Sequence, residues 1–146
     1  MNRKAESFKN YLQENDIKAF SIEEIDDDKN ETVLFRTFVM AGGQRLPAAF
    51  IVDKSIFSVI RVQIVPQILS AENKNRLLQF VNEINFKYKP FKFYFNPAGN
   101  LLLDVCIIDK NNGIDGKEVS LLFNVINNYL NEAYRDLMKV IWQDEA

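Results

Sequence analysis

The spacing of apolar residues along the chain predicts three helices. Apolar positions three and four apart predict a helix over residues 3–15, where Phe8 and Tyr11 share one side. The same spacing predicts a second helix that begins at Ser70, whose hydroxyl can cap the free N–H groups of a first turn. A third apolar stripe runs through residues 116–142. At about 1.5 Å per residue, this last helix is roughly 40 Å long.

Shorter stretches of alternating and β-branched residues predict strands. The expected strands cover residues 32–40, 46–52, 56–65, 91–95 and 101–108, and the segment 17–25 could hold one more. Turns are expected at Gly42-Gly43, at 96–100 and at Asn111-Asn112-Gly113. Consecutive strands joined by tight turns pair antiparallel. We therefore expect a single α+β domain over residues 1–146, an antiparallel sheet with helices on one face, in the order α-β-β-β-α-β-β-α.

Alternation with a period of two divides the strand residues into two sets. The apolar set is expected beneath the helices and contains Val33, Phe35, Val39, Ile60, Val62, Ile64, Phe91, Phe93, Phe95, Leu101, Leu103, Val105 and Ile107. The mixed set contains Leu34, Arg36, Phe38, Met40, Phe57, Val59, Arg61, Gln63, Lys92, Tyr94, Leu102, Asp104, Cys106 and Ile108. A solvated face would carry fewer large apolar groups, and a buried face would not carry unpaired charges.

A face that is half apolar and half charged often marks an interaction site. A loop or the first helix covering part of the face would explain the same pattern. On the interaction hypothesis, a protein or peptide partner contacts Arg36, Phe38, Phe57, Val59, Arg61 and Tyr94. The apolar side chains would be buried, and the arginines would orient the partner through charge-assisted hydrogen bonds. Charge reversal at Arg61 together with Tyr94→Ala is expected to leave the fold intact.

The charge balance argues against a nucleic-acid partner. The chain has 18 Lys and Arg against 20 Asp and Glu, a net charge of −2, and duplex binding needs a basic field. Basic and aromatic residues mix in the segment 86–95, which could form a stacking platform for bases. That segment lacks the glycines of the usual RNA-binding pattern, and its strict alternation predicts a half-buried strand, so we expect no nucleic-acid partner.

The residue inventory excludes several chemistries. There is no histidine, so histidine-based triads and the common zinc motifs cannot be built. The acidic run 26–28 lacks calcium-loop spacing, and no glycine pattern indicates a phosphate loop. The lone cysteine, Cys106, lies in an apolar run and is expected to be buried.

These exclusions favour a protein without catalytic activity. We expect no catalytic, metal or cofactor-binding residues, no membrane span and a cytoplasmic location, because one cysteine fits a reducing compartment. An alternative is a small-ligand-binding protein or an enzyme with a site of scattered residues, such as Asp104 with Lys92.

The segment 77–85, the strand 91–95 and the hairpin into Leu101-Leu102-Leu103 resemble the YbjN-type family of bacterial sensory-transduction regulators. The fold of that family is similar to type III secretion chaperones: a helix, a three-stranded meander, a helix, a hairpin and a long final helix. The resemblance implies a non-enzymatic, homodimeric, protein-binding module with a chaperone-like or regulatory role. A strand within residues 17–25 would depart from that pattern.

Overall fold

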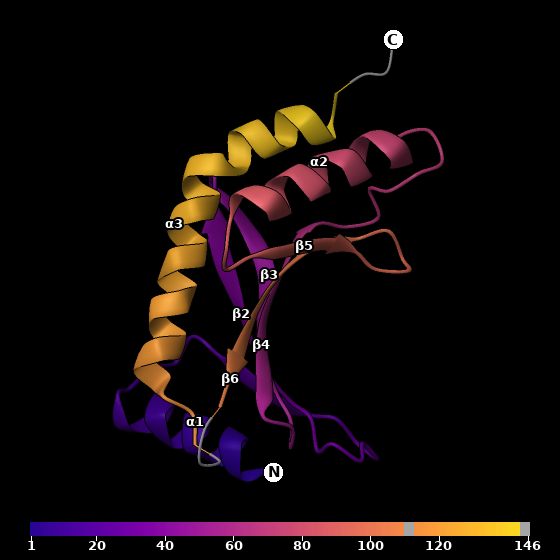
Figure 1. The fold of residues 1–146 in the computed structure, drawn as a ribbon. Helices are drawn as coiled ribbons and strands as arrows, with labels where there is room; N and C mark the ends of the chain where they lie inside the picture. Colours follow the sequence, from indigo (N-terminus) through magenta and orange to yellow (C-terminus); the bar gives the residue numbers. More distant parts are fainter. Residues whose placement is uncertain (110–112, 144–146) are drawn as a thin grey trace.

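The computed structural model describes residues 1–109 and 113–143 and contains three helices and six strands (Figure 1). The helices are α1 (Arg3–Glu14), α2 (Lys74–Lys87) and α3 (Gly116–Ile141). The strands are β1 (Ser21–Glu24), β2 (Val33–Ala41), β3 (Gln44–Val52), β4 (Phe57–Val65), β5 (Lys92–Phe95) and β6 (Leu101–Ile108). The expected α+β class is confirmed, and the segment 17–25 does hold a strand, so the order is α-β-β-β-β-α-β-β-α. The turn expected at Asn111-Asn112-Gly113 lies, except for Gly113, outside the described residues.

The six strands form one antiparallel sheet in the order β1-β2-β3-β4-β6-β5. The β2–β3 hairpin closes where Ala41 pairs with Gln44. The two residues between them, Gly42 and Gly43, have φ values of 54° and 79°. Glycine reaches such positive φ values without steric cost, which a two-residue turn of this kind requires. Gly42 also packs so closely against Tyr134 of α3 that a Cβ atom would lie 2.7 Å from its ring.

All three helices lie on the same side of the sheet. Figure 1 shows α3 running along this side and then bending over the sheet next to α2, with α1 at the opposite end. The strand residues of the predicted apolar set point toward the helices and are buried, except that Phe95 is only half-buried. Phe8 of α1 anchors this core, with its ring centroid 4.9 Å from those of Phe35 and Phe50. No described helix covers the opposite side.

The expected start of the second helix at Ser70 is wrong by four residues. The Ser70 N–H donates to Oδ1 of Asn73 at 2.7 Å, and the Asn73 N–H donates back to Oγ of Ser70 at 3.3 Å. This reciprocal pair stabilises a turn that precedes the helix, and α2 begins at Lys74. Ser70 therefore caps that turn, and Asn73 takes the N-cap position of α2 in its place.

An aromatic junction joins α2, β5 and α3. The centroid of the Tyr129 ring of α3 lies 4.8 Å from the ring centroids of both Tyr88 and Phe91. Burial, and to a smaller degree the neighbouring Tyr88, raises the pKa of Tyr129 to about 12. The packing fixes the turn that leads from α2 into β5, so this edge of the sheet has a defined position.

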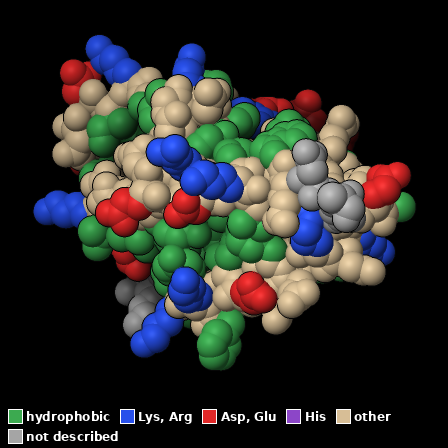
Figure 2. Space-filling model, turned by 90° about the horizontal axis from the view of Figure 1, so that it is seen from above, with side chains coloured by type: hydrophobic (Ala, Val, Ile, Leu, Met, Phe, Trp, Pro, Cys, Tyr) green, Lys and Arg blue, Asp and Glu red, His purple; other side chains and the backbone are tan. Residues whose placement is uncertain are grey.

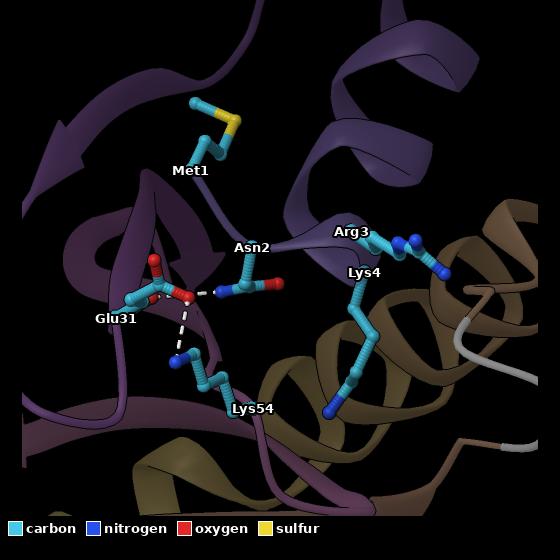
Figure 3. Close-up of a pocket in the computed structure, with 6 residues that line it drawn as sticks. All are labelled: Met1, Asn2, Arg3, Lys4, Glu31 and Lys54. Atoms are coloured by element: carbon cyan, nitrogen blue, oxygen red, sulfur yellow. Dashed lines mark hydrogen bonds and ion pairs between the residues drawn. The ribbon is translucent and has the colours of Figure 1, made fainter.

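Two polar residues at the start of α1 fasten this helix to the sheet. Asn2 is the N-cap, and its Oδ1 accepts from the N–H of Ala5 at 2.8 Å. Its Nδ2 donates to the carbonyl oxygens of Glu31 and Val52 at 2.8 and 3.3 Å. Figure 3 shows Asn2 pointing toward Glu31, while Lys4 points away from it. The cap thus satisfies a helix end and fixes the helix to the loop at Glu31 and to the end of β3.

Lys4 forms a buried ion pair with Asp109. The Lys4 Nζ lies 2.9 Å from Oδ2 of Asp109, and the two side chains are 4% and 3% exposed. Nζ also donates to the carbonyl oxygens of Ser55 and Phe57, at 2.6 and 3.1 Å. The Ser58 hydroxyl donates to the same carboxylate. Buried charges are tolerated only when paired and hydrogen-bonded in this way, so α1 is held at the end of β6.

Removing the cation of this pair should destabilise the fold strongly. Lys4→Met leaves the Asp109 carboxylate buried without its counter-ion, and we expect a loss of about 3–5 kcal/mol in the free energy of unfolding. Urea denaturation followed by circular dichroism measures this loss. Arg3→Met, an exposed cation in the same helix turn, is the control and should change the value by less than about 0.5 kcal/mol. Equal effects of the two substitutions would contradict the assigned role of Lys4.

Candidate protein-binding face

The side of the sheet without helices, hereafter the open face, is organised in rows of residues that pair across the strands. The central row is polar and crosses all six strands: Ser21, Arg36, Ala49, Arg61, Asp104 and Lys92. The adjacent row is mostly apolar and contains Glu23, Leu34, Ile51, Val59 and Cys106. Adjacent strands are about 4.8 Å apart, so the two arginines of the central row are roughly 10 Å apart.

Arg61, Asp104 and Tyr94 form a closed cluster in the central row. Nε and Nη2 of Arg61 donate to the two carboxylate oxygens of Asp104, both at 2.9 Å. The Tyr94 hydroxyl donates to Oδ2 of Asp104 at 3.0 Å. The bond to Asp104 raises the pKa of Arg61, while burial and then the Asp104 charge raise the pKa of Tyr94. Asp104, although buried, therefore has a complete set of partners.

The other charged side chains of the open face also have partners. Arg36 Nε lies 2.7 Å from Oε2 of Glu23 on the neighbouring strand. The Arg45 guanidinium carbon lies 4.1 Å above the centre of the Phe38 ring. Lys92 Nζ lies 4.8 Å from the centre of the Tyr94 ring, a distance at which a cation is attracted to the π face. Arg36 and Arg61 are thus paired with carboxylates, whereas Arg45 and Lys92 contact aromatic rings and keep their positive charges.

Large apolar side chains are exposed on both sides of the polar row. Phe57 and Ile108 pair across β4 and β6, and both are exposed, Ile108 by 61%. Phe38 and Met40 are exposed at the opposite end of β2. Cys106 is also exposed, so its expected burial is wrong. The side chains of the even-numbered residues of β6 point to the open face, and those of Cys106 and Ile108 are exposed there. This face exposes more apolar surface than single, isolated residues would.

The structure places all six sequence-predicted partner residues on the open face, in two groups. Phe57, Val59 and Arg61 follow one another along β4, and Tyr94 lies beyond them on β5. Arg36 and Phe38 lie on β2, with β3 in between. The assignment of these residues to a binding site stays a prediction.

Sequence reasoning missed several members of the open face. It did not sort the third strand into faces, although the same alternation assigns Arg45, Pro47, Ala49 and Ile51 to this side. It also named Asp104 with Lys92 as candidate chemistry, whereas the carboxylate of Asp104 is bonded to Arg61 and Tyr94. Charge reversal at Arg61 would place two carboxylates together, so we now expect this substitution to destabilise the fold.

Two hollows lie at the margins of the open face. One of about 580 Å³ lies beside Phe38 and Arg45, and another of about 730 Å³ follows β6 past Cys106 and Ile108. A polar hollow of about 370 Å³ lies at Asn2 (Figure 3). Within residues 1–109 and 113–143, no group of three acidic, cysteine or histidine side chains could hold a metal ion.

The chain matches no family model and no curated protein. None of the helices in the described part is long and apolar enough to span a membrane.

The Arg61–Asp104 bond should be visible as a coupling in stability. Arg61→Leu leaves the buried Asp104 carboxylate without its cation, and we expect a loss of about 1–3 kcal/mol. Asp104→Leu should cost less, because water can reach the Arg61 side chain, which is partly exposed. The double variant should be more stable than the sum of the two losses predicts.

Chemical denaturation of the three variants measures this cycle. Arg36→Leu removes a more exposed ion pair and is the matched control, with an expected change below about 1 kcal/mol. Additive losses at Arg61 and Asp104 would show that the two side chains do not stabilise each other.

Proposed function

We propose that this chain is a non-enzymatic protein- or peptide-binding module with a chaperone-like or regulatory role, and that the open face contacts the partner. The observation that carries the proposal is the combination of exposed Phe38, Phe57 and Ile108 with charges that are already paired inside the molecule. When an apolar partner covers this face, Arg61 stays paired with Asp104 and Arg36 stays paired with Glu23. The lone exposed thiol of Cys106 fits the cytoplasmic location expected from the sequence.

Burial of the exposed side chains supplies the driving force. Each large apolar side chain that becomes fully buried contributes about 1.5–3 kcal/mol, and association costs part of that sum. The internal bond to Asp104 uses Nε and Nη2 of Arg61. Its other guanidinium nitrogen is not used in that bond and supports the orienting role that the sequence predicted for this arginine.

Binding of peptides should depend on the exposed aromatic residues of the open face. We expect phage-displayed random peptides selected on the protein to be rich in apolar residues, and Phe38→Asp or Phe57→Asp to weaken their binding at least about tenfold. Fluorescence anisotropy with the selected peptides measures the change. Leu121→Asp, at an equally exposed apolar site on α3, is the control and should leave affinity unchanged. Equal loss in all three variants would remove the open face as the binding site.

We further propose that the chain forms a homodimer through the end that carries α2 and the C-terminal half of α3. Figure 2 views the molecule from that end and shows hydrophobic side chains at the surface among charges of both signs. Phe86 of α2 is 95% exposed, and Leu78 and Trp142 are also exposed. Self-association on these helices would leave the open face available to another partner.

Light scattering coupled to size-exclusion chromatography tests this proposal. We expect a mass twice that of the chain, and a shift toward the monomer in Phe86→Glu. Asn82→Glu places the same charge on an exposed site one turn earlier in α2 and should remain dimeric. A monomer at all concentrations would contradict the homodimer, and a dimer unaffected by Phe86→Glu would contradict its location.

A further inference from the structure

Strand β6 is longer than the strand that flanks it at the edge of the sheet. β5 pairs with Leu101–Asp104 only, whereas β4 pairs with the whole length of β6 on its other side. The segment 105–108 therefore has no described strand on its outer side. Figure 1 shows the arrowhead of β6 continuing past β5, next to the first turns of α3.

The register identifies which backbone groups face outward along this segment. The Asp109 N–H donates to the carbonyl oxygen of Ile56 at 2.7 Å, on the β4 side. Backbone groups of successive strand residues point to opposite sides. Val105 and Ile107 therefore bond toward β4, and the N–H and C=O groups of Cys106 and Ile108 point away from it.

Asn85 provides an independent check of this assignment. By the same alternation, the backbone N–H and C=O groups of Asp104 point toward β5. Those of its partner Lys92 therefore point toward β6, and those of Phe93 point outward. The side chain of Asn85 indeed donates to the Phe93 carbonyl oxygen at 2.9 Å and accepts from its N–H at 2.8 Å. An amide side chain thus closes the edge of β5 in the way that a neighbouring strand would.

No described side chain closes the edge at Cys106 and Ile108 in this way. The other sheet edge, β1, is short and carries Glu23 and Glu24, which is the usual protection of an edge against added strands. The outer side of 105–108 has neither an amide cap nor a charge in the strand itself. Its unpaired N–H and C=O groups have the spacing that recognises an extended main chain.

The hollow beside this edge has room for such a chain and a defined polarity. Its volume is about 730 Å³, and it is lined by Val59 and Leu122 as well as the edge itself. Lys89 and Lys92 stand at the end where β5 begins. Asp104 and Glu118 also line the hollow, and the Asp104 carboxylate is already bonded to Arg61 and Tyr94. A strand antiparallel to β6 would run toward these lysines, so its carboxyl end would meet two positive charges.

We propose that this edge binds the extended C-terminal segment of a partner protein as an additional antiparallel strand, with its carboxylate beside Lys89 and Lys92. The proposal rests on the protein-binding function proposed above and names the part of the partner that is recognised. Alternate apolar side chains of the segment would lie against Val59, Cys106 and Ile108 on the open side.

A second copy of this chain fits the edge less well. In a two-fold pairing centred on Cys106, which places the outward backbone groups of the two copies opposite each other, the second copy's Asp104 would lie opposite Ile108. The second copy's β5 flanks its own Asp104, so it would have to occupy the place of Ile108. A free peptide segment carries no such flanking strand.

A fluorescein-labelled peptide, Ser-Gly-Thr-Val-Ile-Val with a free carboxylate, provides the test. We expect the amides of Cys106 and Ile108 to exchange with solvent faster than those of Val105 and Ile107, and to become protected when the peptide is added at about 1 mM. The amidated peptide should bind about tenfold more weakly, as should the free acid to Lys89→Glu. Lys18→Glu, at a distant exposed lysine, is the matched control and should bind normally.

Cys106→Pro tests the backbone contact directly. Proline removes an N–H that points outward and so sacrifices no bond to β4, yet it should abolish peptide binding. Two peptides, N-methylated at the backbone of the penultimate residue or of the residue before it, complement this variant. Only one of these two N–H groups faces β6 in an added strand, so one of the two peptides should lose binding. This test does not depend on whether the protein variant folds.

Two results would overturn the proposal: protection of the Cys106 and Ile108 amides in the free protein, or no protection of them by the peptide. If Cys106→Pro still binds the library-selected peptides that Phe38→Asp loses, the strand-addition site is wrong and the proposed function stands. If Phe38→Asp and Phe57→Asp bind normally while Cys106→Pro does not, the edge alone is the site.

Discussion

Three helices on one side of a six-stranded sheet leave the other side without a layer of its own, and the remaining features of this molecule follow from that asymmetry. The helix side is built for burial, with Phe8 packed against Phe35 and Phe50. The ion pair of Lys4 and Asp109 fixes α1 on this side, at the end of β6. Successive side chains of a strand point to opposite faces of the sheet. Each residue that is buried under the helices therefore places the residues before and after it in the strand on the open face.

The open face resolves a conflict between solubility and binding. Exposed aromatic side chains favour association, and exposed charges oppose it because they must lose water on burial. Here the central charges are paired before any partner arrives, through the bidentate bond of Arg61 to Asp104 and the ion pair of Arg36 with Glu23. The desolvation cost of the first pair is already part of the folding free energy, since Asp104 is buried. A partner therefore gains from Phe38 and Phe57 at a lower electrostatic cost.

Local pattern was enough to predict the strands, the Gly42-Gly43 hairpin and the division of most strand residues between two faces. It failed where an interaction joins distant residues. Alternation places Arg61 and Asp104 on one face, but only the β4–β6 register brings them opposite each other. The apolar run that ends β6 hides the alternation that exposes Cys106. From the sequence, Lys4 is expected to be a solvated cation on an amphipathic helix. Its partner Asp109 lies far away in the sequence, so no local pattern predicts the ion pair.

The unequal lengths of β5 and β6 have a local cause that connects the core to the open edge. Pro90 cannot donate a backbone hydrogen bond, and the aromatic packing of Tyr88 and Phe91 against Tyr129 draws the chain toward the helices at this point. β5 therefore starts only at Lys92, opposite Asp104. Asn85 then closes the short strand at Phe93, and both of its hydrogen bonds are used there. The same aromatic junction that completes the core thus exposes the outer backbone of β6, so the edge is a consequence of how this fold is packed and not of a frayed strand end.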